Sequence, residues 1–253
     1  MKTLAIVNRK GGVGKTTTAV NLAYVLATSC NKRVLLIDAD SQGNASSICP
    51  NPSGGLAAMF MGMEPYYEHL IDKTDVEGLD MMTASEELDD FDLDREQRLS
   101  YFALRDFLDV VEEDDVYDVV VIDCPPYYSM ACLNAIAAAD RVIIPADTTA
   151  YSAEGMGSLV RQIDSIRNTV SPNLSVAGVL VTGVRRSDVD EDALTLMREN
   201  SPVPVFQNYI RRSDDKVRES SWAGKAACDW SPWCNASRDY RKWVAELIAM
   251  GVL

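Results

Sequence analysis

The chain lacks the residues on which several common kinds of site depend. Its 253 residues include one histidine, His69, so we expect neither a histidine-based triad nor a multi-histidine metal site. Its six cysteines are scattered without a C-x-x-C pair, which disfavours a disulfide framework or a zinc site and favours reduced thiols. No apolar run reaches 18 residues, so we expect no membrane-spanning segment.

We also find no linker, no internal repeat and no secretory leader in the sequence. A glycine-rich loop begins near residue 10 and leaves no room for a signal peptide, so we expect a cytoplasmic protein. The length suits one sizeable domain, and no low-complexity stretch divides it. We therefore predict a single domain over residues 1–253, in which residues 50–95 form an acidic, irregular excursion.

The acidity of the chain is local. The net charge is −14, and residues 68–115 alone hold 18 Asp and Glu against four Lys and Arg. The rest of the chain is balanced, with 20 acidic and 20 basic residues. The overall charge therefore does not exclude a basic surface elsewhere, whereas the acidic segment is expected to be a solvated face away from any nucleic acid.

Short apolar runs alternate with longer amphipathic stretches, which is typical of an α/β fold with a mostly parallel twisted sheet and helices on both faces. The predicted strands are Thr3–Val7, Val34–Ile37, Val119–Ile122, Val142–Ile144, Val176–Val181 and Val203–Phe206, with a weaker candidate at Leu79–Met82. The predicted helices are 15–29, 97–112, 129–138, 152–168, 189–199 and 236–250.

The strongest motif lies between the first predicted strand and the first predicted helix, where residues 8–18 read NRKGGVGKTTT. Glycines allow successive N–H groups to point at phosphate oxygens, and the following helix adds its positive dipole end. Lys15 can reach the β- and γ-phosphates, and the Thr16 hydroxyl can ligate Mg²⁺. We therefore predict a P-loop NTPase that binds ATP or ADP with Mg²⁺ through Lys10, Gly11, Gly12, Val13, Gly14, Lys15, Thr16 and Thr17.

The loop departs from the ordinary Walker A pattern, which requires glycine where this chain has Arg9, and it carries a second lysine, Lys10. This form resembles the deviant Walker A loop of the ParA/MinD group of ATPases. In that family the additional lysine crosses a dimer interface and contacts phosphates bound by the partner subunit. The resemblance implies ATP-dependent homodimerisation and catalytic roles for Lys10 and Lys15. The alternative is that Lys10 serves only its own loop.

Two predicted strands end in aspartates, Asp38-Ala-Asp40 after the second and Asp123 after the one at 119–122. Carboxyl ends of parallel strands face the crevice in which α/β sheets bind ligands. Four hydrophobes before Asp123 give the Walker B form, whose carboxylate holds Mg²⁺. Resemblance to ParA implies that Asp40 positions or activates the attacking water, so Asp40 joins the catalytic residues. Turn or cap chemistry is the alternative for Asp38 and Asp40. The expected metal ligands are Thr16, Asp38 and Asp123.

Two basic segments in the last third of the chain, residues 183–187 and 210–219, resemble regions that grip the DNA backbone in ATP-bound ParA dimers. Such contacts would be directed at phosphates, independent of sequence and sensitive to salt. Acidic residues interleave with the basic ones, so a salt-bridged surface is the alternative. The candidate DNA-binding residues are Arg185, Arg186, Arg211, Arg212, Lys216 and Arg218. The sequence leaves open whether Trp222, Trp230 and Trp233 belong to the core or to an interface.

The resemblance implies a ParA-like partition ATPase that dimerises with ATP, binds DNA non-specifically and is stimulated by a ParB-like, centromere-binding partner. It would associate with the nucleoid when ATP is bound. The alternative is a MinD-like positioning ATPase with a membrane or protein cargo, but the basic residues near the end precede the apolar helix face instead of lining it, so we expect no membrane partner. The third reading is a metabolic or electron-transfer relative, such as a nitrogenase-iron-protein-like or a cobyrinate-amidating enzyme. Cys124 and Cys132 do not offer a clear cluster-binding layout for the first, and the length leaves no room for the glutaminase domain that the second normally adds.

Overall fold

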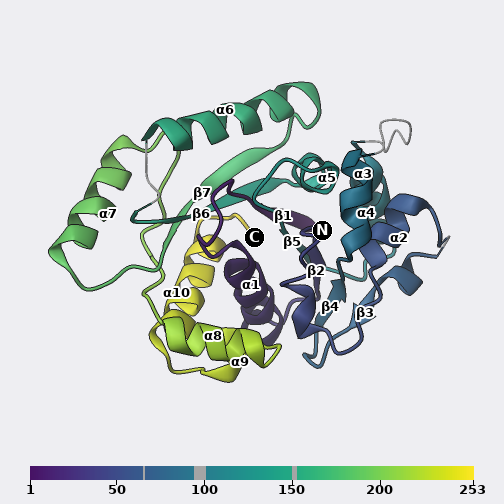
Figure 1. Ribbon diagram of the computed structural model, residues 1–253, viewed down its shortest axis with the longest axis horizontal. Coiled ribbons are helices and arrows are strands. Elements are labelled where there is room, and N and C mark those ends of the chain that lie inside the picture. Colours follow the sequence, from purple (N-terminus) through teal and green to yellow (C-terminus); the bar gives the residue numbers. More distant parts are fainter. Residues whose placement is uncertain (65, 94–100, 150–152) are drawn as a thin grey trace.

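The computed structural model describes residues 1–64, 66–93, 101–149 and 153–253 (Figure 1). Within these residues one seven-stranded sheet has the order β3-β4-β2-β5-β1-β6-β7. Neighbouring strands are parallel except for the antiparallel pair β3 and β4. The strands are β1 (Lys2–Ile6), β2 (Val34–Asp38), β3 (Asp72–Lys73), β4 (Leu79–Met82), β5 (Val119–Asp123), β6 (Arg141–Asp147) and β7 (Ser175–Thr182).

Helices cover both faces of the sheet (Figure 1). Helices α1 (Lys15–Cys30), α9 (Ala227–Trp230) and α10 (Asn235–Ala249) pack against one face. Helices α4 (Ala103–Glu113), α5 (Met130–Ala138) and α6 (Ala153–Thr169) pack against the other. The remaining α-helices of the described chain are α2 (Gly55–Met61), α3 (Asp90–Leu93), α7 (Asp188–Asn200) and α8 (Asp214–Trp222). None of the helices described is both long enough and apolar enough to cross a bilayer.

Strands β2 and β5, in the middle of the sheet, are buried along their whole length. Every residue of β2 and of β5 is buried, because alternate side chains enter the two hydrophobic cores on opposite faces of the sheet. Such strands read as continuous apolar runs, which is the pattern that predicted them. The predicted α/β fold, with a mostly parallel sheet between two helical layers, is confirmed.

One predicted strand was wrong. Residues 203–206 form no strand and contribute only a single bridge, from Val205 to Val179 of β7. Pro204 has no N–H to donate to a ladder, so the pairing cannot extend along this segment. Its carbonyl still accepts a hydrogen bond from the Val179 N–H at 2.8 Å, which keeps the segment beside the edge strand.

Helix boundaries differ from expectation where sequence periodicity is weak. Residues 97–100 and 152, the expected starts of two helices, lie outside the described residues, and α4 begins at Ala103. The short helices α2 and α9 escaped prediction because segments this short contain too few residues to show a helical period. The weaker strand candidate, β4, does form and pairs with β2 through Val34 and Leu79.

Candidate active site at the carboxyl edge of the sheet

Strand register brings the polar strand ends together. Asp38 of β2 and Asp123 of β5 are paired residues on adjacent parallel strands. Asp147 of β6 and Thr182 of β7 are paired in the same way on the other side of β1. Since β1 leads directly into the glycine-rich loop, the loop is flanked by both pairs. This is the edge at which open α/β sheets bind their ligands.

The loop has the backbone of an anion-binding turn. Gly12 and Gly14 have φ angles of 76° and 83°, in the left-handed region that a side chain disfavours. Helix α1 starts immediately afterwards, and no side chain caps its first N–H groups, which leaves them available to a phosphate. The Thr182 hydroxyl donates a hydrogen bond of 2.8 Å to the Val13 carbonyl and so ties the loop to β7.

The two loop lysines have different surroundings. Lys15 is 7% exposed, and its Nζ donates to the Lys10 carbonyl at 3.4 Å, inside the turn of the loop. Lys10 has a side chain 46% exposed, and its Nζ lies 3.4 Å from Asp147 and 3.5 Å from the Thr149 hydroxyl. The Lys10 ammonium therefore points away from its own loop, whereas Lys15 lines it.

Asp123 is a buried carboxylate. The residue is fully buried, and neither of its oxygens accepts a well-formed hydrogen bond from another described residue, although the Thr16 hydroxyl lies nearby. Burial raises its pKa well above the usual range, and the neighbouring Asp38 charge raises it further, while the nearby Thr16 hydroxyl and Lys15 oppose the shift. A buried carboxylate of this kind is costly unless a cation binds to it, so Asp123 and Thr16 fit a Mg²⁺ site.

Asp38 is also fully buried, but the protein satisfies its oxygens. One oxygen accepts hydrogen bonds of 2.8 Å from both the N–H and the hydroxyl of Ser46, and the other accepts from the Asp40 N–H at 3.2 Å. Desolvation by burial raises the pKa of Asp38 to about 6 in spite of these bonds. Asp38 therefore orders the segment after β2 and stands beside Asp123 as a second carboxylate.

Asp40 lies at the start of that segment and is 7% exposed. Its carboxylate accepts a hydrogen bond from the Gln42 N–H at 3.2 Å, and its carbonyl accepts one from Gly43 at 2.8 Å. Contacts of this kind are expected under the alternative interpretation of Asp40, in which it only stabilises a turn. They leave further acceptor positions on the carboxylate, so the turn geometry and a role toward water are compatible.

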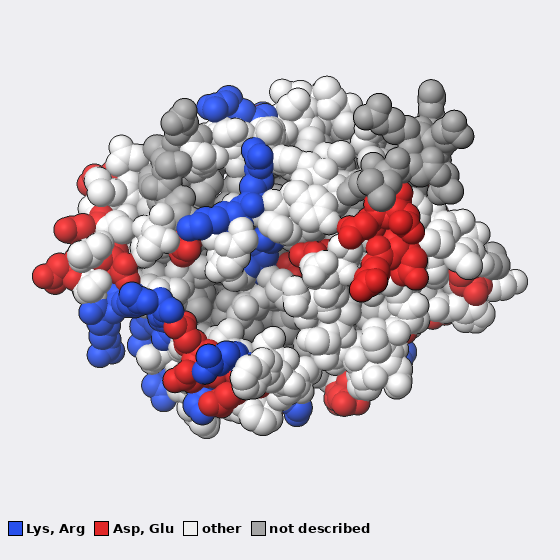
Figure 2. Space-filling view, viewed as in Figure 1, with Lys and Arg blue, Asp and Glu red and all other residues white. Residues whose placement is uncertain are grey.

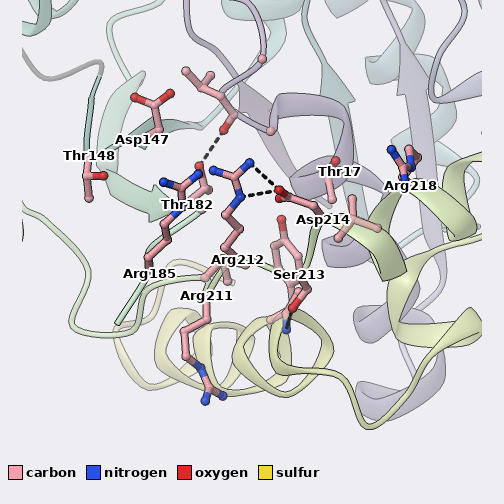
Figure 3. A pocket seen from close by; sticks show the side chains of 18 of the residues that line it. Thr17, Asp147, Thr148, Thr182, Arg185, Arg211, Arg212, Ser213, Asp214 and Arg218 are labelled. Atoms are coloured by element: carbon pink, nitrogen blue, oxygen red, sulfur yellow. Dashed lines mark hydrogen bonds and ion pairs between the residues drawn. The ribbon is translucent and has the colours of Figure 1, made fainter. Parts of the chain in front are cut away.

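A cavity of about 590 Å³ opens from the loop toward α8 (Figure 3). The loop contributes Gly12, Val13, Gly14 and Thr17 to it. The ends of β6 and β7 contribute Asp147, Thr148 and Thr182, and the segment leading into α8 contributes Arg212, Ser213 and Asp214. Figure 3 shows the Arg212 guanidinium paired with Asp214 of the same segment. The volume is within the usual range for small-molecule sites.

Comparison of the sequence with known proteins identifies the family to which the chain belongs. A family model described as AAA domain matches residues 1–176. The chromosome partitioning protein ParA of Caulobacter vibrioides is 36% identical over an alignment covering 98% of this chain and 94% of that protein. The chromosome-partitioning ATPase Soj of Thermus thermophilus is 34% identical, with 98% of this chain and 96% of that protein covered. The chain belongs to the ParA family of P-loop ATPases.

A solved structure of a metabolic enzyme shares the fold. The cobyrinic acid a,c-diamide synthase of Mycobacterium smegmatis, crystallised with ADP and magnesium, is similar with a TM-score of 0.80 and 28% identity, covering 98% of this chain and 94% of that one. The ParA of Caulobacter is more similar in sequence, at 36%. The fold alone therefore does not separate partition ATPases from enzymes such as this synthase.

The six basic residues expected to bind DNA in a ParA protein have unequal surroundings. Arg211 makes two side-chain hydrogen bonds of 2.8 Å to Asp239, a residue only 5% exposed. Arg212 pairs with Asp214, Lys216 with Glu219 at 2.8 Å, and Arg218 with Asp215 at 3.3 Å. Arg185 and Arg186 are exposed and have no ion pair to another described residue.

The ion pairs give the α7–α8 edge a mixed surface. Figure 2 shows basic and acidic side chains side by side there, as the salt-bridged alternative predicted. The structure binds the Arg211 side chain to Asp239 of α10, and four of the six candidates line the cavity: Arg185, Arg211, Arg212 and Arg218. Arg185 and Arg186 are the two candidates without an ion pair to another described residue, although the Asp190 carboxylate lies near Arg185.

Three residues that line the cavity, Asp147, Thr182 and Asp190, were not predicted as site residues from the sequence. Asp147 and Thr182 end apolar strands, which is the signal that identified Asp38 and Asp123, and it would have found them too. Asp190 of α7 gave no comparable signal. It accepts hydrogen bonds from the Thr148 hydroxyl at 2.8 Å and from the Arg185 N–H at 2.6 Å, and this contact ties the end of β6 to the start of α7.

Proposed function

We propose that this chain is a ParA-type partition ATPase. It binds ATP with Mg²⁺, forms a nucleotide-sandwich homodimer, and binds DNA without sequence preference while ATP is bound. A ParB-like partner stimulates its slow hydrolysis, and the cycle positions a chromosome, plasmid or mobile element in the cytoplasm, on the nucleoid. The names of the related partition proteins of Caulobacter and Thermus support this proposal.

The placement of Lys10 is the observation that carries the proposal. An ammonium that served its own loop would turn inward, as Lys15 does. Lys10 instead lies exposed beside Asp147, where the nearest described acceptors hold it by long contacts of 3.4 Å. Such weak contacts at a half-exposed side chain are readily exchanged. In a dimer, Lys10 can leave Asp147 for the phosphates of a partner and neutralise charge that develops during phosphoryl transfer.

The chain offers a group for each role in hydrolysis. The loop N–H groups and Lys15 hold the β- and γ-phosphates, and Thr16 with Asp123 would hold Mg²⁺, with Asp38 beside them. When bound, the ion neutralises phosphate charge. Asp40 would orient the attacking water, and its burial and turn contacts hold its carboxylate. The arrangement suits a slow hydrolase that waits for a further contribution from a partner.

The MinD-like alternative is less well supported. A membrane anchor would need a helix with an apolar face open to lipid. Helix α10 buries Trp243, Val244 and Leu247 in the core on the α1 face of the sheet, and Trp243 packs edge-on against Phe206 at 5.7 Å between ring centroids. The C-terminal helix is thus committed to the fold.

The proposal is tested by DNA binding in defined nucleotide states. Binding of a random-sequence duplex is measured by fluorescence anisotropy with ADP, with ATP, and with ATP for Asp40→Ala, and mass is measured in parallel by light scattering. We expect a dimer and salt-sensitive DNA binding only with ATP, persisting in Asp40→Ala because hydrolysis is blocked.

The control separates the two lysines. Lys10→Ala should bind ATP as a monomer and fail to bind DNA, whereas Lys15→Ala should lose nucleotide binding itself. A Lys10→Ala variant that dimerises like the wild type, or a wild-type dimer that ignores DNA in every state, would contradict the proposal and leave a protein or membrane cargo instead.

A further inference from the structure

Trp222 is an exposed indole at the edge of the nucleotide cavity. It is the last residue of α8 and is 82% exposed, yet it lines the same cavity of about 590 Å³ as Gly12, Gly14 and Thr17 of the phosphate loop. Trp233 is exposed to a similar extent, 79%, and does not line this cavity. The position of Trp222, and not its exposure alone, therefore sets it apart.

Arg218 holds the Trp222 ring on the helix. Its guanidinium lies over the ring, 5.6 Å from the centroid, one helical turn earlier. Arg218 is itself held by Asp215 at 3.3 Å, in the same turn of α8. The ring is thus partly preorganised, while most of its surface is open to water. An open aromatic surface at a cavity rim gains free energy when a flat apolar group covers it.

Two chemically different sets of residues line the cavity. The loop and the uncapped start of α1 present N–H groups to an anion. Helix α8 presents Asp214, Val217, Arg218, Ser221 and Trp222. A nucleotide has the same division, because its charged phosphates are joined through the ribose to a flat purine base. With the phosphates on the loop, the base is directed toward the α8 wall.

We propose that Trp222 is a base-stacking residue of this nucleotide site, with a purine nucleoside di- or triphosphate as its ligand. The proposal rests on the nucleotide binding proposed above and adds a residue to it. The indole covers one face of the base, and Arg218 braces the indole from the helix. Trp222 takes no part in the chemistry of the γ-phosphate, so its effect falls on affinity and not on the hydrolytic step.

The test compares nucleotides with a ligand that has no base. Dissociation constants for Mg·ADP and for inorganic triphosphate are measured by calorimetry with the wild type, Trp222→Ala, Trp222→Phe and Trp233→Ala. Loss of base–aromatic stacking in Trp222→Ala should weaken Mg·ADP binding by about tenfold and leave triphosphate binding within about twofold. Trp222→Phe should recover part of the loss, and Trp233→Ala should match the wild type.

Fluorescence and steady-state kinetics provide independent readouts. Mg·ADP should quench tryptophan emission in the wild type and in Trp233→Phe, and the quenching should disappear in Trp222→Phe. KM for ATP should rise in Trp222→Ala while kcat stays unchanged. A Trp222→Ala variant with wild-type affinity for Mg·ADP would overturn this inference and leave the proposed function standing. A wild type that binds neither Mg·ADP nor Mg·ATP would overturn both.

A third result would assign the indole to a protein contact. If Trp222→Ala binds Mg·ADP normally but no longer dimerises with ATP, the exposed ring belongs to a subunit interface and the stacking proposal is wrong. Because Trp222 is exposed, its replacement removes little core packing, and the Trp222→Phe variant keeps an aromatic ring should the alanine variant fold poorly.

Discussion

At the scale of single residues, the two ends of β5 show opposite uses of aspartate. Asp118 immediately precedes the strand and pairs with Arg33 at 2.7 Å, and the Arg33 N–H also donates to it at 2.8 Å. Asp123 ends the strand, fully buried, and neither carboxylate oxygen accepts a well-formed hydrogen bond from another described residue. The first aspartate contributes to folding, and the second has a burial cost that a bound cation would offset.

Asp123→Asn should therefore stabilise the protein without ligand and abolish its function. Burial and the neighbouring Asp38 raise the pKa of Asp123, so the folded state bears a cost that a neutral amide reduces. We expect a gain of about 1 kcal/mol, or roughly 2–4 °C in Tm, by thermal unfolding without nucleotide. Mg²⁺ should no longer strengthen ATP binding in the variant. A lower Tm without ligand would contradict this account of the buried carboxylate.

Asp118→Asn, the same substitution at the other end of the strand, should destabilise. Hydrogen bonds from the Arg33 side chain lower the pKa of Asp118 to about 2. The stabilisation is therefore present above the ordinary carboxyl pKa of about 4 and is lost as pH falls toward 2. Partial exposure limits the effect to about 1 kcal/mol. Urea unfolding at pH 5 and pH 3 should show a steeper loss in the wild type than in the variant, and equal losses would refute the assignment.

At the scale of secondary-structure elements, the site is held by contacts between segments distant in sequence. Thr182 of β7 bonds to the Val13 carbonyl in the phosphate loop, and Asp190 of α7 bonds to Thr148 after β6. Arg211, just before α8, bonds to Asp239 of α10 through its N–H and its guanidinium. These bonds connect the cavity wall to the helices that the core fixes in place.

Arg211→Ala should lower stability more than Arg212→Ala, although the two arginines are neighbours. Removing Arg211 leaves Asp239 with a buried carboxylate and no counter-charge, which costs about 2–4 kcal/mol for a mostly buried pair. Arg212 has a side chain 43% exposed and its loss should cost under about 1 kcal/mol. Urea unfolding of both variants gives the comparison, and equal losses would mean that the Arg211–Asp239 pair does not anchor the loop.

Thr182→Val should weaken nucleotide binding by loosening the phosphate loop. Valine keeps the shape of threonine but cannot donate to the Val13 carbonyl, which then lacks this partner. The unmet hydrogen bond costs about 1–3 kcal/mol, part of it in the geometry of the loop. We expect a several-fold rise in Kd for Mg·ADP by calorimetry, while Thr195→Val on α7, outside the cavity, should leave Kd unchanged.

At the scale of the whole molecule, charge is unevenly distributed. Figure 2 shows an acidic patch on the α3–α4 side of the molecule and the mixed basic and acidic surface on the α7–α8 side. The acidic segment lies around β3, β4 and the following helices, at one edge of the sheet, and Arg185 and Arg186 follow β7 at the opposite edge. A DNA phosphate backbone would therefore approach at the β7 edge.

Replacing Arg185 and Arg186 together by alanine should reduce ATP-dependent DNA binding and its salt dependence. Each phosphate contact contributes about 0.9 to the slope of log K against log salt, so losing both should lower the slope by about 2 per subunit. Lys73→Ala provides the control, because this exposed lysine at the acidic edge pairs with Asp80. An unchanged slope in the double variant would exclude the β7 edge as the DNA-binding surface.

Much of the fold and of the phosphate site was predictable from the sequence, because both depend on local pattern. Buried parallel strands read as apolar runs, and the loop motif carries its glycines, its lysines and Thr16 within a few consecutive positions. The strand predicted at 203–206 failed because Pro204 interrupts its ladder. Asp190 could not be predicted as a residue of the cavity, since its place there depends on contacts with Thr148 and Arg185 in other segments.

The sequence by itself determined the α/β class, the nucleotide loop and the ParA family, because periodicity and motif spacing are properties of neighbouring residues. Tertiary structure alone decided which charges are paired. Six basic residues look alike in sequence, yet Arg211 is bound to a buried carboxylate of α10, and Arg185 and Arg186 are left exposed. It also decided that Trp222 lines the cavity while Trp233 does not. Both outcomes depend on contacts between distant segments, which form only when the sheet brings its strand ends and helices together.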